Sequence, residues 1–382
     1  MSRIFIQAYC QFPHGSALAN YVQNWGKAVS YAGYDVILVT DINKDFDLDK
    51  YKLFYKFMDI VSISPSENMA KRQLQRKNGF CEERLDVLKR YRINKSDKVI
   101  VLGIRNEVFL EKLFEFREKI QFKIICGVFE LFGREDFNKE EDYRKAMHIK
   151  GEVYLQANAI LSISEYIDKY YKEKGKRTFC FPPMIDIDES IAREKKMNKY
   201  CFIILSPKDS LKSMLMAFAA LTREEINKIE LHLCGIESYV LKEVIGETEW
   251  IQLKKCIKIH NWMDYEELTT LYKKMHFLVI ARNICQRTLA NFPSKVPEVM
   301  MYRIVPIVSD VGDYTKYYLK DGYDSIFIKD DSVKEIQNAI RKAMSMDLKE
   351  YRSYSENAQK TAKERFDYHI WAPQIREMLE GV

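Results

Sequence analysis

The chain has 382 residues, which is too long for one ordinary hydrophobic core and fits two domains. Its composition, with 47% hydrophobic and 30% charged residues, excludes a disordered or a fibrous protein. The formal net charge is only +6, and residues 68–95, with nine basic against three acidic side chains, account for this excess. We therefore expect a folded two-domain protein without a nucleic-acid partner.

The eight cysteines are scattered along the chain, and no two lie close enough to indicate a metal site or a redox pair. Several lie inside apolar runs, which favours free, buried thiols in a reducing compartment. The apolar run at the N-terminus is too short for a signal peptide, and no apolar stretch approaches the ~18 residues of a membrane span. We therefore expect a cytoplasmic protein, at most peripheral at the inner face of a membrane.

From the N-terminus onward, short strand-like runs alternate with amphipathic helical patterns, beginning with a strand, a helix and a strand at 3–8, 17–32 and 35–40. Further strands are expected at 98–102, 123–128, 159–163 and 178–181, with a helix over 107–119. This alternation predicts a parallel sheet covered by helices, which ends near Pro182-Pro183.

A charged, poorly patterned stretch at 191–199 reads as a linker between this sheet and a second strand–helix series. The strands of that series are expected at 201–205, 230–234, 257–260, 277–281, 305–309 and 325–328. Its helices are expected to begin near Leu211, Tyr265, Lys295, Tyr314 and Val333. The predicted domains are residues 1–190 and 200–360, followed by 361–382 with a final helix.

In open parallel sheets, ligands bind beyond the carboxyl ends of the strands, so the loops after the strands are the candidate sites. The loop 206–213 carries Lys208 and Lys212 at the start of a helix, which suits a diphosphate. Arg282 follows the strand 277–281, and Gly312 follows the strand 305–309 and permits a close approach.

The segment 291–298 opens the helix between these two strands. Backbone amides near Ser294 and Lys295, together with the Lys295 ammonium, are placed to hold phosphate oxygens. Glu298, one turn further on, is placed to accept hydrogen bonds from ribose hydroxyls. As isolated residues, these side chains would equally fit a helix-start acid and solvated surface cations.

The string Phe292-Pro-Ser-Lys-Val-Pro-Glu298, followed by Met300 to Gly312 and by Lys320-Asp-Gly322, resembles the donor half of family 4 retaining glycosyltransferases. Weaker matches cover most of the chain, at 20–40, 161–166, 182–186 and Lys212-Ser213. The resemblance implies an α/β GT-B fold, in which two Rossmann-like doubly wound domains face a central cleft. It also implies that the final helix packs back on the first domain.

For function, the resemblance implies metal-independent transfer of a hexose-type unit, with retention, from a nucleotide diphosphate sugar. The acceptor would be a glycan or a lipid-linked glycan in cell-surface polysaccharide or glycoconjugate synthesis, and no cofactor is expected. The implied catalytic residues are Glu130, Lys212, Arg282 and Lys295. The implied substrate-binding residues are His14, Gly15, Lys208, Phe292, Pro293, Ser294, Glu298 and Gly312. Glu130 and Arg134 lie in the loop after strand 123–128, on the acceptor side.

Two departures from the family pattern bear on activity. The family pairs two glutamates eight positions apart, and here the first of them is Ala290, so the acid that faces the sugar is missing. A glycine usually ends the helix before strand 305–309, and this chain has Arg303 there. Two alternatives therefore stay open: a catalytically silent GT-B module that binds a glycan or a partner transferase, and a sugar-nucleotide epimerase.

Two further patterns receive weaker interpretations. The triplets Asp47-Leu-Asp49 and Asp186-Ile-Asp188 have the spacing of an Asp-x-Asp metal motif, but such triplets are common by chance, and we predict no metal site. The basic stretch 68–95 is either a solvated face or a contact with an anionic membrane surface.

Overall fold

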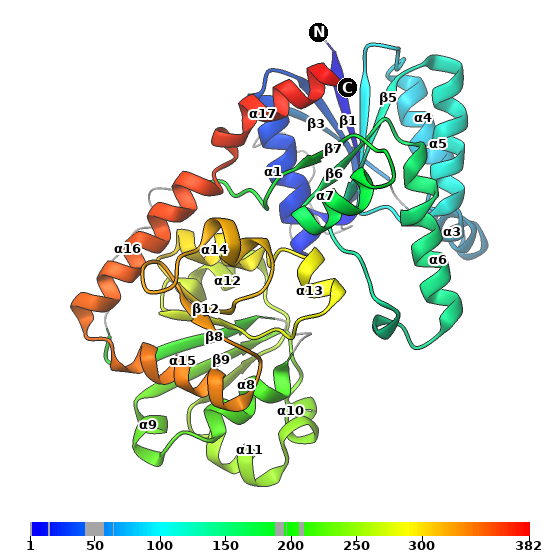
Figure 1. Ribbon diagram of the computed structural model, residues 1–382. Coiled ribbons are helices and arrows are strands. Elements are labelled where there is room, and N and C mark those ends of the chain that lie inside the picture. The colour runs from blue at the N-terminus through cyan, green and yellow to red at the C-terminus, as the bar shows by residue number, and fades with distance from the viewer. Residues whose placement is uncertain are drawn as a thin grey trace. The chain divides into compact units, whose positions relative to one another are not determined.

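The computed structural model describes residues 2–13, 16–42, 57–63, 65–187, 195, 197–205 and 210–382. The chain divides into two compact units (Figure 1). The first comprises Met1–Met184, Ala290–Phe292 and Tyr368–Val382, and the second comprises Ile185–Leu289 and Pro293–Asp367. Each unit is built on one parallel sheet, so each is described by itself.

The sheet of the first unit has the strand order β3-β2-β1-β4-β5-β6-β7, and its strand pairs are parallel. Its strands are β1 (Arg3–Phe12), β2 (Asp35–Ile42), β3 (Met58–Ser62), β4 (Lys98–Leu102), β5 (Lys123–Val128), β6 (Ala159–Ser162) and β7 (Thr178–Cys180). Ile4, Phe5 and Ile6 are all fully buried, as expected for a strand covered on both faces. The strand order reverses between β1 and β4, which is where doubly wound sheets bind ligands.

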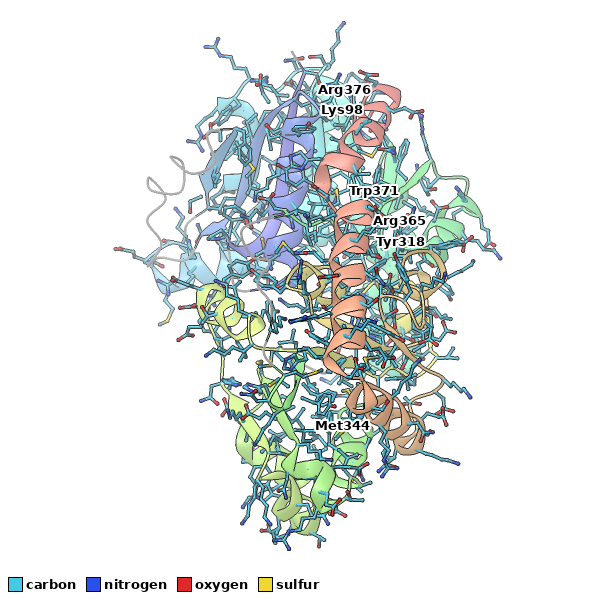
Figure 2. The ribbon with its side chains drawn as sticks, turned by 90° about the vertical axis from the view of Figure 1, so that its left-hand side faces the viewer. Lys98, Tyr318, Met344, Arg365, Trp371 and Arg376 are labelled. Atoms are coloured by element: carbon cyan, nitrogen blue, oxygen red, sulfur yellow. The ribbon has the colours of Figure 1, made fainter. Side chains whose placement is uncertain are left out.

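The helices around this sheet are α1 (Ala17–Tyr31), α3 (Met69–Lys77), α4 (Cys81–Arg90), α5 (Glu107–Ile120), α6 (Glu140–Gly151), α7 (Glu165–Lys172) and α17 (Tyr368–Gly381). Side-chain caps begin four of them, α1, α3, α5 and α7. The Ser16 hydroxyl, for example, accepts from the Ala19 amide at 3.1 Å. The last helix, α17, packs against α1 (Figure 1). Arg376 of α17, which is labelled in Figure 2, donates to the Ala32 carbonyl at 2.8 Å.

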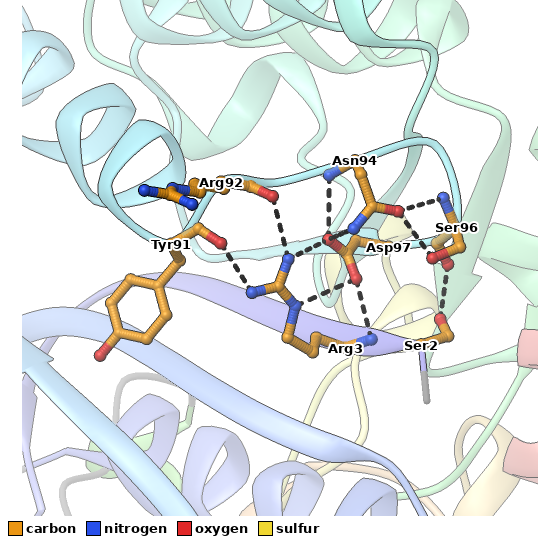
Figure 3. Close-up of polar contacts among 7 residues, drawn as sticks. All are labelled: Ser2, Arg3, Tyr91, Arg92, Asn94, Ser96 and Asp97. Atoms are coloured by element: carbon orange, nitrogen blue, oxygen red, sulfur yellow. Dashed lines mark hydrogen bonds and ion pairs between the residues drawn. The ribbon is translucent and has the colours of Figure 1, made fainter.

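A polar network fastens the amino-terminal edge of the first sheet (Figure 3). Arg3, the first residue of β1, forms a 2.7 Å ion pair with Asp97, which precedes β4. The Arg3 guanidinium also donates to the carbonyls of Tyr91 and Arg92, at 2.6 and 3.1 Å. The Asp97 carboxylate, 1% exposed, further accepts from the Asn94 backbone and side chain. The amino-terminal edge is thus filled by structural contacts.

Arg84 departs from the basic surface expected over 68–95, because it is completely buried. Its guanidinium donates to the Gln7 side-chain oxygen at 3.1 Å and to the carbonyls of Ala8 and Gly79 at 2.9 and 3.2 Å. This residue therefore joins α4 to β1, and the stretch is not one continuous exposed face.

The sheet of the second unit has the order β10-β9-β8-β11-β12-β13, again with parallel pairs. Its strands are β8 (Tyr200–Leu205), β9 (Ile229–Cys234), β10 (Ile257–His260), β11 (Phe277–Ile280), β12 (Val305–Ser309) and β13 (Ile326–Ile328). Its α-helices are α8 (Leu211–Ala219), α9 (Arg223–Asn227), α10 (Ser238–Ile245), α11 (Glu247–Leu253), α12 (Tyr265–Tyr272), α13 (Gln286–Ala290), α14 (Lys295–Met301), α15 (Val333–Ser345) and α16 (Leu348–Arg365). The segment Tyr314–Tyr318 forms a turn of π-helix.

These two parallel, helix-covered sheets confirm the predicted α/β fold class. Arg303, which stands after α14 where the family usually has a glycine, adopts the left-handed backbone conformation, with φ +58°. Its guanidinium donates to Gln359 at 3.0 Å, and its carbonyl accepts from the Tyr351 hydroxyl at 2.9 Å. Side-chain anchoring therefore holds a backbone conformation that usually requires glycine.

Candidate functional site

Lys295 and Glu298 meet on the first turn of α14. The Lys295 ammonium donates to both carboxylate oxygens of Glu298, at 3.0 and 2.9 Å. The Tyr272 hydroxyl, from the end of α12, donates to Oε1 of the same carboxylate at 3.2 Å. The Glu298 side chain is 10% exposed and the Lys295 side chain 27% exposed. The pair therefore lies at the edge of the core, where a ligand can reach Lys295.

Tyr272 serves as a fixed donor to this pair. Burial, and then the adjacent Glu298 carboxylate, raise the pKa of the Tyr272 phenol well above its ordinary value of 10.0. Tyr272 therefore keeps its proton and donates to the carboxylate. Cys234, the last residue of β9, has its thiol pKa raised to about 12 by burial, and the Lys295 charge opposes this rise. Lys295 thus lies near the carboxyl end of β9, and ligands of open parallel sheets bind beyond the carboxyl ends of the strands.

Gly312 makes the turn after β12 with φ +80°. A Cβ added here would lie 3.3 Å from the Thr288 carbonyl oxygen, so the close neighbour is the chain's own backbone. Thr288 in turn holds the loop after β11, because its hydroxyl donates to the Asn283 carbonyl at 2.7 Å. Gly312 therefore lets the loops that follow β11 and β12 pack together.

Replacing Gly312 with alanine should destabilise the protein by about 1 to 3 kcal/mol, because the side chain meets both a left-handed backbone and the Thr288 carbonyl. Gly322→Ala is the matched control, since Gly322 has φ +76° and its nearest neighbour is the Tyr354 hydroxyl at 3.9 Å. The midpoint of urea unfolding should fall further for Gly312→Ala. Equal midpoints would contradict a role for the loop contact.

Arg282 lies directly after β11, beside the point where the strand order of the second sheet reverses. Its backbone amide donates to the Ser309 hydroxyl, at the end of β12, across 2.8 Å. Its side chain is half-buried. Arg282 is therefore held at the carboxyl edge of the sheet by a residue that the sequence did not single out.

Lys212 is exposed on the first turn of α8, after β8. Ser210, which begins this helix with φ +47°, donates its hydroxyl to Asp331 at 2.8 Å. Lys208 lies outside the described residues, as do His14 and Gly15 of the first unit. The structure therefore places one of the two lysines predicted for this loop.

The segment before α14 is divided between the two units. Phe292 is buried, and Ala290 is fully buried, with its carbonyl accepting from the Ser164 hydroxyl of the first unit at 2.8 Å. Pro293 is also buried, and Ser294 is half-buried and makes no side-chain cap bond with α14. A buried alanine thus occupies the position where the family has its first acid.

In the first unit, Glu130 follows β5 and pairs with Arg105, which follows β4, at 2.9 Å. The backbone carbonyl of Glu130 accepts from the buried ammonium of Lys150 in α6. Arg134 is exposed and donates instead to Glu140 at 2.5 Å and to the Phe137 carbonyl at 2.6 Å. The structure therefore joins Glu130 with two cations that the sequence analysis did not select.

The described residues contain no cluster of three or more metal-ligating side chains. Asp186 is exposed, while Asp188 and the triplet at 47–49 lie outside the described part of the chain. No helix within the described ranges is both long and apolar enough to cross a membrane. At the carboxyl edge of the second sheet, Lys295, Arg282 and Glu298 supply two cations and a carboxylate, and cations suit a charged leaving group.

Comparison with protein families finds a match to the family described as glycosyl transferases group 1, over residues 185–361. No curated protein sequence matches the chain. Among solved structures, HepE of Anabaena in complex with UDP and glucose is similar, with a TM-score of 0.70, 12% identity and full coverage of both chains. Sucrose-phosphate synthase of Thermosynechococcus elongatus has a TM-score of 0.71 and 14% identity over 99% of each chain.

A third similar structure is WaaG, a glycosyltransferase involved in lipopolysaccharide biosynthesis, with a TM-score of 0.66 and 12% identity over 99% of this chain and 100% of that one. At such identities these likenesses show the shared fold. The family match covers the segment with Lys295, Glu298 and Gly312. Residues 185–361 therefore match the glycosyl transferases group 1 family, and the whole chain shares its fold with solved glycosyltransferases.

Proposed function

We propose that the protein transfers a hexose-type sugar from a nucleotide diphosphate sugar to a glycan or lipid-linked glycan. The observation that carries this proposal is the Lys295–Glu298 pair at 2.9 Å, near the end of β9 and inside the matched segment. In this proposal the second unit binds the donor and the first unit binds the acceptor. HepE was solved with UDP-glucose, so a uridine donor is the first to test.

The proposed step breaks the bond between the anomeric carbon and the diphosphate oxygen, and the diphosphate leaves with the electron pair. The acceptor oxygen bonds to the same carbon with retention, and its proton passes to the leaving phosphate. Lys295, Lys212 and Arg282 would neutralise the charge that develops on the diphosphate, without a metal ion. Glu298 would accept from the ribose hydroxyls.

A thermal-shift panel of nucleotide sugars is the direct test of donor binding. A donor at 100 times its Kd adds about 2.7 kcal/mol to the free energy of unfolding, which raises Tm measurably. Release of UDP or GDP from the stabilising donor, with and without EDTA, then tests transfer or hydrolysis. Stabilisation without turnover would favour the alternative of a catalytically silent GT-B module, which the alanine at position 290 suggested. An isomerised nucleotide sugar would indicate the epimerase.

We also propose that α3 contacts an anionic membrane surface, where a lipid-linked acceptor would lie. This helix has no buried residue, and Met69 and Leu74 are 73% and 57% exposed. Lys71 and Lys77 are exposed beside them, while Arg72 is held by the Ser66 carbonyl at 2.8 Å. Exposed apolar side chains among cations are typical of helices that lie at lipid headgroups.

Co-sedimentation with vesicles tests this contact. The wild type should sediment with phosphatidylglycerol vesicles and not with phosphatidylcholine vesicles. Lys71→Glu with Lys77→Glu should reduce binding at least about 10-fold, since each basic residue contributes ~1 kcal/mol. The same charge change at Lys254 and Lys255, two exposed lysines of the second unit, should leave binding unchanged. Equal sedimentation with both lipids would refute the proposal.

A further inference from the structure

Lys150 is a lysine that the fold of the first unit buries. It lies near the end of α6 and is 4% exposed. Its ammonium donates to the backbone carbonyl of Glu130 and lies 4.3 Å from the centroid of the Phe132 ring. Within the described residues, no carboxylate forms an ion pair with Lys150. A neutral carbonyl and an aromatic ring are therefore its partners.

This arrangement is costly for folding. Burial, and to a smaller extent the nearby Arg105 charge, lower the pKa of the Lys150 ammonium from 10.5 to about 7, and the Glu130 charge opposes this shift. A methionine of similar length would fill the same space without a charge to desolvate. A buried lysine with a strongly lowered pKa is typical of a functional site, where stability is exchanged for activity.

The contacts of Lys150 converge on the loop that carries Glu130. Glu130 is held at its carbonyl by Lys150 and at its carboxylate by Arg105, at 2.9 Å. The Arg105 guanidinium carbon also lies 5.2 Å from the centroid of the Phe132 ring, so both cations adjoin one aromatic side chain. The two cations therefore fix this loop at the Glu130 carbonyl, the Glu130 carboxylate and the Phe132 ring.

Lys150 is itself fixed by its surroundings. Its backbone carbonyl accepts from the buried Tyr171 hydroxyl at 2.7 Å. Two residues earlier on α6, His148 lies 2.9 Å from Glu107, the first residue of α5. The helix is thus tied both to α7 and to the segment that follows Arg105. Such support is what holds a side chain within a narrow range of positions.

We propose that Lys150 is a positioning residue, which holds the Glu130 carboxylate at the carboxyl edge of the first sheet to receive a hydroxyl of the sugar acceptor. This inference rests on the proposed transfer function. Lys150 does not touch the acceptor and acts through Glu130. The charged groups that act on its ammonium are Arg105, from the loop after β4, and Glu130, from the loop after β5.

The test compares Lys150→Met and Lys150→Arg with Lys145→Met, an exposed lysine on the same helix. The donor is the nucleotide sugar that gives the largest thermal shift, and octyl β-glycosides serve as acceptor probes. Lys150→Met should lower the acceptor kcat/KM roughly 10- to 100-fold. The donor Kd and the slow hydrolysis of the donor should stay unchanged. Lys150→Arg should recover part of the loss, and Lys145→Met should behave as wild type.

The pH profile adds a readout that a purely structural role would not move. In the wild type the acceptor kcat/KM should fall as pH rises through about 7, because the hydrogen bond to the Glu130 carbonyl weakens when Lys150 loses its charge. That fall should be absent in both Lys150 variants. Equal losses for donor and acceptor, or an unchanged acceptor kcat/KM, would overturn the inference.

Absence of turnover in the wild type would instead count against the proposed function. In that case the melting temperatures of Lys150→Met and the wild type test the inference about Lys150 independently of activity. If Lys150 has a role other than folding, Lys150→Met should melt above the wild type at pH 6. If the variant melts below the wild type at that pH, Lys150 stabilises the fold and the inference fails.

Discussion

Glu298→Ala is expected to lower kcat/KM for the nucleotide-sugar donor by roughly 10- to 150-fold, which corresponds to the about 1.5 to 3 kcal/mol of a charged hydrogen bond. The carboxylate is placed for this role because Lys295 and Tyr272 both donate to it, at 2.9 to 3.2 Å. Steady-state kinetics with donor varied at saturating acceptor, or donor hydrolysis alone, measures the change. A folded variant with unchanged kcat/KM would remove Glu298 from the donor site.

The same substitution also affects stability, so a second variant is needed to separate the two effects. Loss of the carboxylate leaves the buried Tyr272 hydroxyl without its acceptor, at a cost of about 1 to 3 kcal/mol. Tyr272→Phe removes this hydrogen bond and leaves Glu298 paired with Lys295. It should reduce stability while donor kcat/KM stays near wild type. A matching loss of kcat/KM would mean that Glu298 acts mainly by supporting the fold.

Much of the strand framework followed from the sequence, because buried parallel strands are short apolar runs bounded by polar residues. The runs at 123–128, 257–260 and 305–309 match β5, β10 and β12 at both ends. The edge strand Met58–Ser62 was missed. Asp59 interrupts its apolar run, is exposed, and accepts from the Tyr91 hydroxyl. Only the finished sheet shows that this segment pairs with β2.

The candidate site was predictable where it depends on order along the chain, and not where it depends on packing. Lys295 and Glu298 lie three residues apart at the start of a helix, and their pairing follows from helix geometry. Tyr272 lies 26 residues away from Glu298, and no local pattern distinguishes it from other tyrosines. Arg303 shows a second limit, because its left-handed backbone depends on contacts with a distant helix.

The burial of Lys150 could not be predicted from its neighbours in the sequence. It lies near the end of a highly charged helix, where a lysine usually reaches into solvent and complements the helix dipole. The Phe132 ring and the Glu130 carbonyl come from another segment of the chain. Burial of this lysine therefore becomes visible only in three dimensions.

Lys150→Met should raise the free energy of unfolding relative to the wild type below pH 7, and the difference should shrink as pH rises toward 10. The wild-type lysine has a pKa of about 7 when folded and 10.5 as its ordinary value. Between these values the unfolded chain binds the extra proton, so wild-type stability increases with pH. The full shift corresponds to roughly 5 kcal/mol, and loss of the hydrogen bond to the Glu130 carbonyl offsets about 1 to 3 kcal/mol of the gain.

Urea unfolding of both proteins from pH 6 to pH 10 measures this difference, with Lys145→Met as the control that should follow the wild type. Lys195, a half-buried lysine whose pKa burial lowers well below its ordinary value, also makes wild-type stability depend on pH. It is present in every variant, so its contribution cancels in the comparison. Parallel profiles for Lys150→Met and the wild type would mean that Lys150 has an ordinary pKa in the folded protein. Burial of this lysine would then not reduce stability, and the argument that it serves a function would fail.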